Sequence, residues 1–330
     1  MSRRAWILLG LTAACVVAAV VVVALSASGT TRAATADDPQ AVALPSTPYV
    51  VFLDLDSAHP QDYGRVAVAP LDDLGAPPTL AQVACERVYF SVGGGLCLEK
   101  TGRFPVRYKA TILDTHLRPV RSLRVPGVPS RTRVSADGRW GTATTFVSGH
   151  SYADLGGFST HAMIIDMRTG EKVIDNLEDL PVTRDGRPME SIDHNFWGIT
   201  FGPDDGTFYA TLSTAGTTYL VRGSISGRRL EVLHENVECP SVSPDGTRIA
   251  YKKRVGSYGL WHVTVLDLAT MRETPLAELD PIDDQIEWLD DETVLYHNGG
   301  GIQAVPADGS GVPREFLAVA GSPSVVRPAR

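Results

Sequence analysis

From about Tyr49 onward the chain consists of β-rich runs of four to eight residues with turn residues between them, and no long stretch holds apolar residues at helical spacing. Three of these runs end in a similar turn and lead into a second β-rich run. The turns are Ser-Ala-Asp-Gly at residues 135–138, Gly-Pro-Asp-Asp-Gly at 202–206 and Ser-Pro-Asp-Gly at 243–246. Repeats of about 40 residues built from short strands predict a β-propeller.

The predicted strands group into six blades. Five follow one another along the chain, at residues 83–125, 131–175, 198–233, 240–276 and 285–318. The sixth blade combines residues 322–326 from the C-terminus with residues 49–55, 65–69 and 79–81 from the N-terminus. Closure by strands from both ends leaves no open sheet edge. We therefore expect an all-β, six-bladed propeller over residues 49–330.

The repeated turns have a mechanical explanation. In the turn at residues 243–246, Pro244 presets φ, Asp245 can accept a hydrogen bond from a nearby backbone amide, and Gly246 can take a positive φ. The sialidase Asp-box, Ser-x-Asp-x-Gly-x-x-Trp, is a functional rival that residues 135–140 partly match. There the glycine comes one residue early and the tryptophan two, so we interpret the turns as structural.

A separate signal lies at the N-terminus. Residues 6–25 carry neither a charge nor a proline and follow Arg3 and Arg4. A helix of this length covers the roughly 30 Å of a bilayer core, and the arginines favour a cytoplasmic N-terminus. We expect a cytoplasmic segment at residues 1–5, a transmembrane signal anchor at 6–25 and a flexible linker at 26–48. The alternative is secretion after signal cleavage at the small residues that follow the apolar run.

Composition and charge narrow the possibilities. The 31 Gly and 22 Pro residues are too many for a helical protein, while 43% hydrophobic residues can form a sizeable core. The net charge of −8 opposes binding to a phosphate backbone, so nucleic acid is not an expected partner.

Four cysteines add one further expectation. Cys15 lies in the apolar N-terminal run, and an oxidising exterior favours one pair among Cys85, Cys97 and Cys239. Cys85 and Cys97 are nearest in sequence, but the predicted strands place them roughly six residues out of register. We keep this disulfide as a hypothesis, with Cys239 free.

Residues 243–251, Ser-Pro-Asp-Gly followed by a strand with Arg-Ile-Ala-Tyr, resemble the WD-like repeats of TolB-like six-bladed propellers. Residues 148–152, 195–198, 238–241 and 283–288 are similar to segments of membrane-anchored TolB-like proteins of high-GC bacteria. The resemblance covers roughly residues 49–326. For TolB itself it implies protein–protein contacts in maintenance of the cell envelope.

Propeller geometry also predicts where a ligand binds. The loops that lead into the innermost strands, and those that join the second and third strands, emerge on one face around the central channel. Polar and aromatic groups that converge there are typical of a binding site. The candidates are His150, Tyr152, Asp193, Asn195, Trp197, Asp283, Asp284 and Gln285.

The function we expect is non-enzymatic: an extracytoplasmic platform, tethered to the cytoplasmic membrane and needing no cofactor, that binds an envelope protein or glycan. The alternative is an extracytoplasmic enzyme, lactonase-like or glycan-cleaving, with calcium at the channel mouth. Its ligands would be Asp193, Asn195, Asp283 and Asp284, since carboxylate and amide oxygens suit a hard cation. A serine nucleophile at Ser151 is disfavoured because the chain has no α/β-hydrolase pattern around it.

Overall fold

The computed structural model describes residues 41–147, 158–191, 193–204, 206–256 and 260–328. The chain divides into two units, and the described residues all belong to the second, Gln40–Arg330. The expected transmembrane segment at residues 6–25 lies outside them. Within the described ranges no helix is long and apolar enough to cross a membrane.

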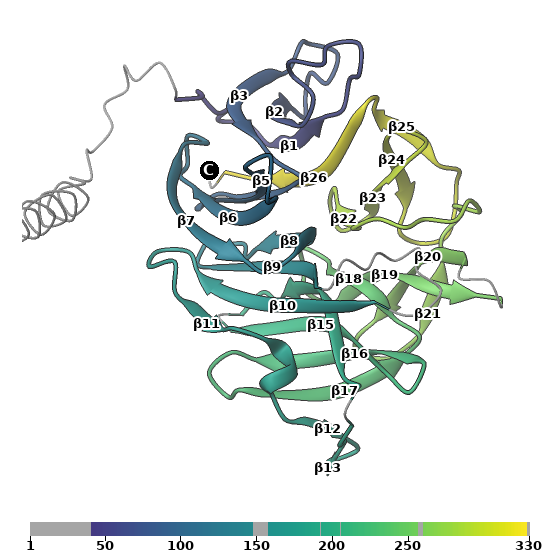
Figure 1. Ribbon diagram of the computed structural model, residues 1–330. Coiled ribbons are helices and arrows are strands. Elements are labelled where there is room, and N and C mark those ends of the chain that lie inside the picture. Colours follow the sequence, from purple (N-terminus) through teal and green to yellow (C-terminus); the bar gives the residue numbers. More distant parts are fainter. Residues whose placement is uncertain (1–40, 148–157, 192, 205, 257–259, 329–330) are drawn as a thin grey trace, which may run out of the picture. The chain divides into compact units, whose positions relative to one another are not determined.

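Six sheets in the described part of the second unit form six blades arranged in a ring (Figure 1). The centre of the ring, between the innermost strands, is here called the channel. Blade one holds β4 (Arg87–Ser91), β5 (Gly94–Thr101), β6 (Arg107–Leu113) and β7 (Pro119–Val125). Blade two holds β8 (Val128–Val134), β9 (Trp140–Val147), β10 (Ser159–Asp166) and β11 (Lys172–Ile174). Blade three holds β14 (Asn195–Phe201), β15 (Thr207–Thr214), β16 (Thr217–Ser224) and β17 (Arg229–Glu235).

The remaining three blades complete the ring. Blade four holds β18 (Glu238–Val242), β19 (Arg248–Val255), β20 (Leu260–Asp267) and β21 (Glu273–Pro275). Blade five holds β22 (Glu287–Trp288), β23 (Thr293–Asn298), β24 (Gly301–Pro306) and β25 (Arg314–Leu317). Blade six holds β26 (Ala320–Val326), β1 (Tyr49–Asp54), β2 (Arg65–Pro70) and β3 (Thr79–Ala84). The strands β4, β8, β14, β18, β22 and β26 contact one another in a closed series and line the channel.

The predicted closure by both ends of the chain is confirmed. In blade six the C-terminal strand β26 pairs antiparallel with the N-terminal strand β1, with Tyr49 opposite Val326 and Val50 opposite Val325. Closure of the ring therefore depends on pairing across nearly the whole sequence.

The core lies between the blades. Along β1, Val51 and Leu53 pack against blade one, whereas Val50 and Phe52 pack against blade five. Successive strand residues point to opposite faces, and both faces are covered by a neighbouring blade, so the strand is apolar throughout. Four further clusters of buried apolar side chains fill the other gaps between neighbouring blades.

The Asp-Gly turns have the same hydrogen bonds in two blades, which confirms their structural role. The Ser135 hydroxyl donates to Asp137 at 2.6 Å and accepts from the Trp140 amide at 2.9 Å. The Ser243 hydroxyl likewise donates to Asp245 at 2.6 Å and accepts from the amide of Arg248 at 3.0 Å. In both turns the glycine has φ near +75°, a conformation that glycine adopts at little cost.

The first strand of blade one differs from the prediction. Val83 belongs to β3 of blade six, and β4 begins only at Arg87. Cys85 therefore lies in the connection between two blades, where its Cα is 5.6 Å from the Cα of Cys97 on β5. The predicted Cys85–Cys97 disulfide is confirmed, and the expected register conflict is wrong because Cys85 is not on the inner strand. Cys239 is buried and free.

Blade three contains an addition that the sequence pattern did not predict. A 3₁₀ turn, η1 (Leu177–Asp179), leads into a short hairpin of β12 (Val182–Arg184) and β13 (Arg187–Pro188). β12 pairs parallel with β17, the outermost of the four regular strands of this blade. Three-residue strands give too little alternation to be recognised in a sequence.

Candidate functional site

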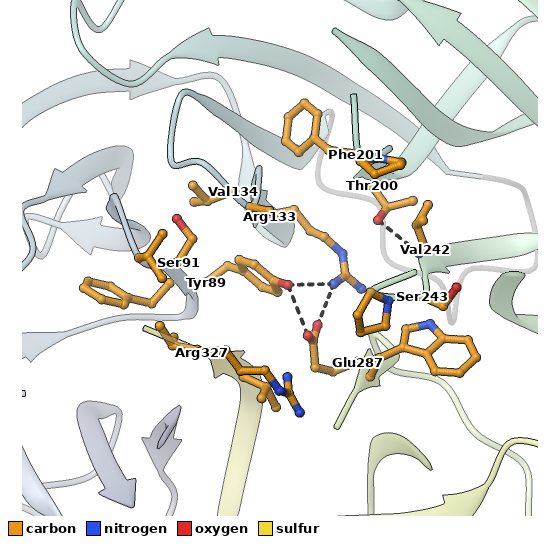
Figure 2. A pocket seen from close by; sticks show the side chains of 18 of the residues that line it. Tyr89, Ser91, Arg133, Val134, Thr200, Phe201, Val242, Ser243, Glu287 and Arg327 are labelled. Carbon is orange, nitrogen blue, oxygen red and sulfur yellow. Dashed lines mark hydrogen bonds and ion pairs between the residues drawn. The ribbon is translucent and has the colours of Figure 1, made fainter. Parts of the chain in front are cut away.

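The side chains that line the channel come from one recurring position of the innermost strands. This position lies two residues before the turn that ends the strand. Tyr89, Arg133, Ser241 and Glu287 occupy this position in blades one, two, four and five. The Arg133 guanidinium pairs with the Glu287 carboxylate at 2.5 Å and donates to the Ser241 hydroxyl at 2.9 Å. The Tyr89 hydroxyl donates to Glu287 at 3.1 Å and accepts from Arg133 at 3.1 Å (Figure 2). Four blades thus meet in one polar network.

Burial sets the electrostatics of this network. Removal from water raises the pKa of Tyr89 above its ordinary range, and the neighbouring Glu287 carboxylate raises it further, so the phenol remains a donor. Burial opposes the charge of Arg133, but Tyr89 and Glu287 outweigh that effect and raise the pKa of Arg133. The guanidinium is therefore a permanent cation in the channel.

One end of the channel, here called the turn mouth, is formed by the Asp-Gly turns and their equivalents. A cavity of about 260 Å³ opens there above Arg133 and Glu287. The turns of four blades and the end of β26 line it, with Val92, Ala136, Pro203, Pro244 and Arg327 among the contributing residues. Figure 2 labels Ser91, Phe201, Ser243 and Arg327 around this cavity. The turns are scaffold, but they also border this cavity.

The opposite end, here called the loop mouth, is formed by the loops that lead into the innermost strands. Asp283 and Asp284 lie here, in the loop that leads into β22. Arg131, two residues before Arg133 on β8, reaches both carboxylates at 3.8 Å. Lys252 also pairs with Asp283, and Arg87 lies 4.0 Å from Asp284. Three basic groups from three blades therefore surround two consecutive aspartates.

The basic groups determine the charge state of Asp284. Burial by itself would raise the pKa of this carboxyl group, but the positive charges of Arg87 and Arg131 outweigh burial and lower it. Asp284 is thus an anion held between arginines. Asp283 is more accessible, with 41% of its side chain exposed.

A cavity of about 450 Å³ adjoins these aspartates at the loop mouth. It lies between blades five, six and one, and its lining includes apolar as well as charged side chains. Among the lining residues are Leu55, Tyr63, Arg87, His297 and Asn298. The Nε2 atom of His297 is buried and has no hydrogen-bond partner in the described structure. This mixture of apolar surface and a few polar groups is typical of a ligand site.

The structure brings together only part of the predicted site. Asp283, Asp284 and Gln285 are consecutive at the loop mouth, and Gln285 is half-buried. His150 and Tyr152 lie outside the described residues.

Two of the predicted site residues of blade three, Asp193 and Asn195, form hydrogen bonds within the protein. The Asp193 carboxylate accepts hydrogen bonds from the Ser191 and Thr214 hydroxyls and the Ala215 amide, which lower its pKa to about 2. Asn195 accepts from the Thr160 amide at 3.0 Å and hydroxyl at 2.6 Å and donates to the Phe158 carbonyl.

Trp197 is buried, and its ring centroid lies 4.9 Å from that of Phe158. Its Nε1 atom finds no acceptor among the described residues. Asn195 and Trp197 therefore join blade three to the segment before β10, and neither is an open binding group.

The four hypothetical calcium ligands do not form one set. Within the described ranges, no three His, Cys, Asp or Glu side chains are grouped in a way that could hold a metal ion. Asp193 thus does not join Asp283 and Asp284, whose neighbours are Arg87, Arg131 and Lys252. Cationic neighbours disfavour a bound cation at these carboxylates.

The sequence prediction missed Tyr89, Ser241 and Glu287. A signal for them exists, because they share their spacing from the turn with Arg133 and Thr200. Charged residues such as Arg133 and Glu287 inside predicted inner strands are conspicuous, since a lone buried charge is costly and a pair of opposite charges compensates it.

No protein-family model and no curated protein matches the sequence. Among solved structures, TolB from Acinetobacter baumannii has a TM-score of 0.56 and 16% identity, over 84% of this chain and 66% of the TolB chain. This chain has a TolB-like propeller fold. It spans slightly less than two thirds of that TolB structure.

Two other solved structures share the architecture. A chain of a nidogen/laminin complex matches with a TM-score of 0.53 and 11% identity, over 86% of this chain and 100% of its own length. A functionally unknown protein from Desulfotomaculum acetoxidans matches with a TM-score of 0.50 and 12% identity, over 88% of this chain and 89% of its own. At these identities the similarity concerns the TolB-like fold.

Proposed function

We propose that this chain is a non-enzymatic binding platform, tethered to the cytoplasmic membrane by residues 6–25, that binds an envelope protein or glycan at the loop mouth. The proposal rests chiefly on the cavity beside Asp283 and Asp284. It offers charges of both signs and apolar walls in one place.

The charge arrangement supports recognition. Asp284 and Arg131 are buried and hold each other in place, whereas Asp283 and Arg87 are partly exposed at the rim of the cavity. A ligand with hydrogen-bond donors and acceptors, such as a peptide segment or an amino sugar, can exchange contacts with the exposed pair. Pre-organised polar groups lower the ordering cost of binding.

The fold supports the same proposal. TolB-like propellers place variable loops around a channel mouth on a rigid ring of blades, and binding residues are commonly found on such loops. The structural neighbour from a nidogen/laminin complex comes from a protein–protein assembly.

The test is crosslinking of the full chain in its native envelope, followed by mass spectrometry of the adducts. Asn298→Trp places a large ring at the cavity without removing any of the charged groups at the loop mouth. The matched control is Val312→Trp, at a 75% exposed position between β24 and β25 of the same blade. We expect a defined protein or glycan adduct in the unmodified chain and the control, and its loss in Asn298→Trp.

Equal adducts in both variants would show that the loop mouth is not the binding site. Absence of any defined adduct, with the protein present at normal abundance, would contradict the platform proposal itself.

A further inference from the structure

The hairpin between β5 and β6 of blade one carries an exposed apolar tip. The tip sequence is Phe104-Pro105-Val106, and the Phe104 side chain is 97% exposed. Val106 is also exposed, at 40%. Phe104, Pro105 and Val106 together form a small contiguous apolar patch at the end of the hairpin, and exposed apolar patches mark interaction or membrane-binding sites.

The same blade is strongly basic in an acidic protein. Seven of the 30 Lys and Arg residues of the chain lie between residues 100 and 124, and Asp114 is the only acidic residue in that range. Lys109 pairs with Glu99 and Arg118 with Asp114. The exposed side chains of Lys100, Arg103, Arg107, Arg121 and Arg124 form no ion pair with another described residue.

A shallow hollow lies beside the tip. Its volume is about 290 Å³, and its lining combines Arg107 and Arg124 with apolar groups such as Val106, Val128 and Phe146. The register places Lys109 opposite Arg124 on adjacent strands, so Arg107 and Arg124 come from neighbouring strands at the same end of the blade. Two guanidinium groups over an apolar surface suit a ligand with an anionic head and a hydrocarbon body.

From this arrangement we infer that the β5–β6 hairpin docks on an anionic lipid surface. Phe104 and Val106 enter the boundary between headgroups and acyl chains, while Arg103, Arg107 and Arg124 bind lipid phosphates. Peripheral membrane binding has this physical basis: an aromatic side chain inserts into the interface, and the basic residues around it are attracted to anionic headgroups. The remainder of the chain is acidic and is repelled by the same surface, so docking is confined to this edge of the propeller.

Lipid suits the shape of the tip better than an acidic protein does. A stable protein interface needs about 800 Å² of each partner, with its strongest contacts enclosed in a surrounding patch. Phe104 instead protrudes from a narrow hairpin. A fluid interface can close around such a tip without a complementary pocket.

The experiment uses the full chain reconstituted in vesicles, with a photoreactive benzoylphenylalanine at position 104 and, as a control, at the exposed position of Val312. The vesicles contain either phosphatidylcholine alone or an equal mixture with phosphatidylglycerol. We expect lipid adducts at position 104 with the anionic mixture, at least fivefold more than with phosphatidylcholine, and few at position 312. Both chains carry the same N-terminal apolar run, so that segment cannot explain a difference between them.

A second variant tests the charges separately. Arg103→Gln with Arg107→Gln and Arg124→Gln leaves the apolar tip intact, and each lost arginine lowers binding to an anionic surface by about fivefold. We expect the lipid adduct at position 104 to fall by at least tenfold. Crosslinking of the same probe in native membranes tests for a protein partner at position 104. The inference is overturned if position 104 gives no more lipid adduct than position 312, if the anionic lipid makes no difference, or if native membranes give a protein adduct at position 104 instead of lipid.

Discussion

Arg133 and Glu287 stand 154 residues apart in the sequence and form a 2.5 Å ion pair inside the channel, where both side chains are more than nine-tenths buried. Because they come from β8 and β22, the pair joins two blades that are not neighbours in the ring. Tyr89 completes the contact from a third blade. The ion pair therefore forms only when the whole propeller is correctly assembled.

We predict that Glu287→Gln lowers the free energy of unfolding by about 3–5 kcal/mol, because it leaves the Arg133 cation buried without a counter-charge. Replacing both residues, Arg133→Met with Glu287→Leu, should recover most of that loss. Urea unfolding of each variant measures the effect.

A matched control exists on the surface of blade three. Arg222 and Glu231 also form an ion pair, at 2.7 Å, but about half of each side chain is exposed. Glu231→Gln should cost less than about 1 kcal/mol. Similar losses at both sites would contradict the burial argument.

The disulfide supplies a second prediction. Cys85 and Cys97 are separated by 12 positions and connect the link between blades six and one to β5. Closing a loop of this size lowers the conformational entropy of the unfolded chain, which raises the free energy of the unfolded state by about 3 kcal/mol. Cys85→Ala with Cys97→Ala should lower the free energy of unfolding by about 2–4 kcal/mol, measured in urea without reductant.

Reductant should have little further effect on that double variant. Cys239→Ala serves as the control, because Cys239 is buried and free, and this variant should keep its full sensitivity to reductant. A double variant as stable as the unmodified protein would show that the disulfide contributes nothing.

Glu273 gives a pH prediction. Burial alone would raise the pKa of this carboxyl group, but hydrogen bonds from Lys253, Tyr251 and His234 outweigh burial and lower it to about 2. A folded-state pKa below the unfolded value means that the ionised carboxylate stabilises the fold above about pH 5. That contribution is lost as the pH falls from about 5 to about 2.

Glu273→Gln should therefore be about 2 kcal/mol less stable than the unmodified chain at pH 7, after allowance for partial exposure, and the two should converge toward pH 2. Thermal unfolding across this pH range provides the measurement. A constant difference between the two proteins at all pH values would assign the effect to packing instead of charge.

Gly198 gives a prediction about how closely two neighbouring inner strands approach each other. It has φ of +63°, and a Cβ added there would lie 2.7 Å from the Cα of Cys239 on the next inner strand. Gly186 has a similar φ of +72° but open space around it. Gly186→Ala should cost about 1–2 kcal/mol from conformation alone, and Gly198→Ala should cost at least twice as much. Equal costs in urea unfolding would mean that the blades separate easily at this point.

The strands and the Asp-Gly turns could be predicted from the sequence because each depends on a local signal. Alternation along a strand determines which side chains share a face, and the chemistry of Ser243, Asp245 and Gly246 determines a turn within four residues. The terminal strands left over after five complete blades identify the sixth. These signals require no knowledge of which blades face each other.

The site depended on the tertiary structure. Arg131, Lys252 and Arg87 surround Asp283 and Asp284 only because the curvature of the ring brings distant blades together. A one-residue change of register would turn each of these side chains to the other face of its strand. The sequence by itself thus determined the repeated blade and its turns. The tertiary structure decided that Asp283 and Asp284 are paired with Arg131, Lys252 and Arg87, because charge partners are selected by distance across the channel.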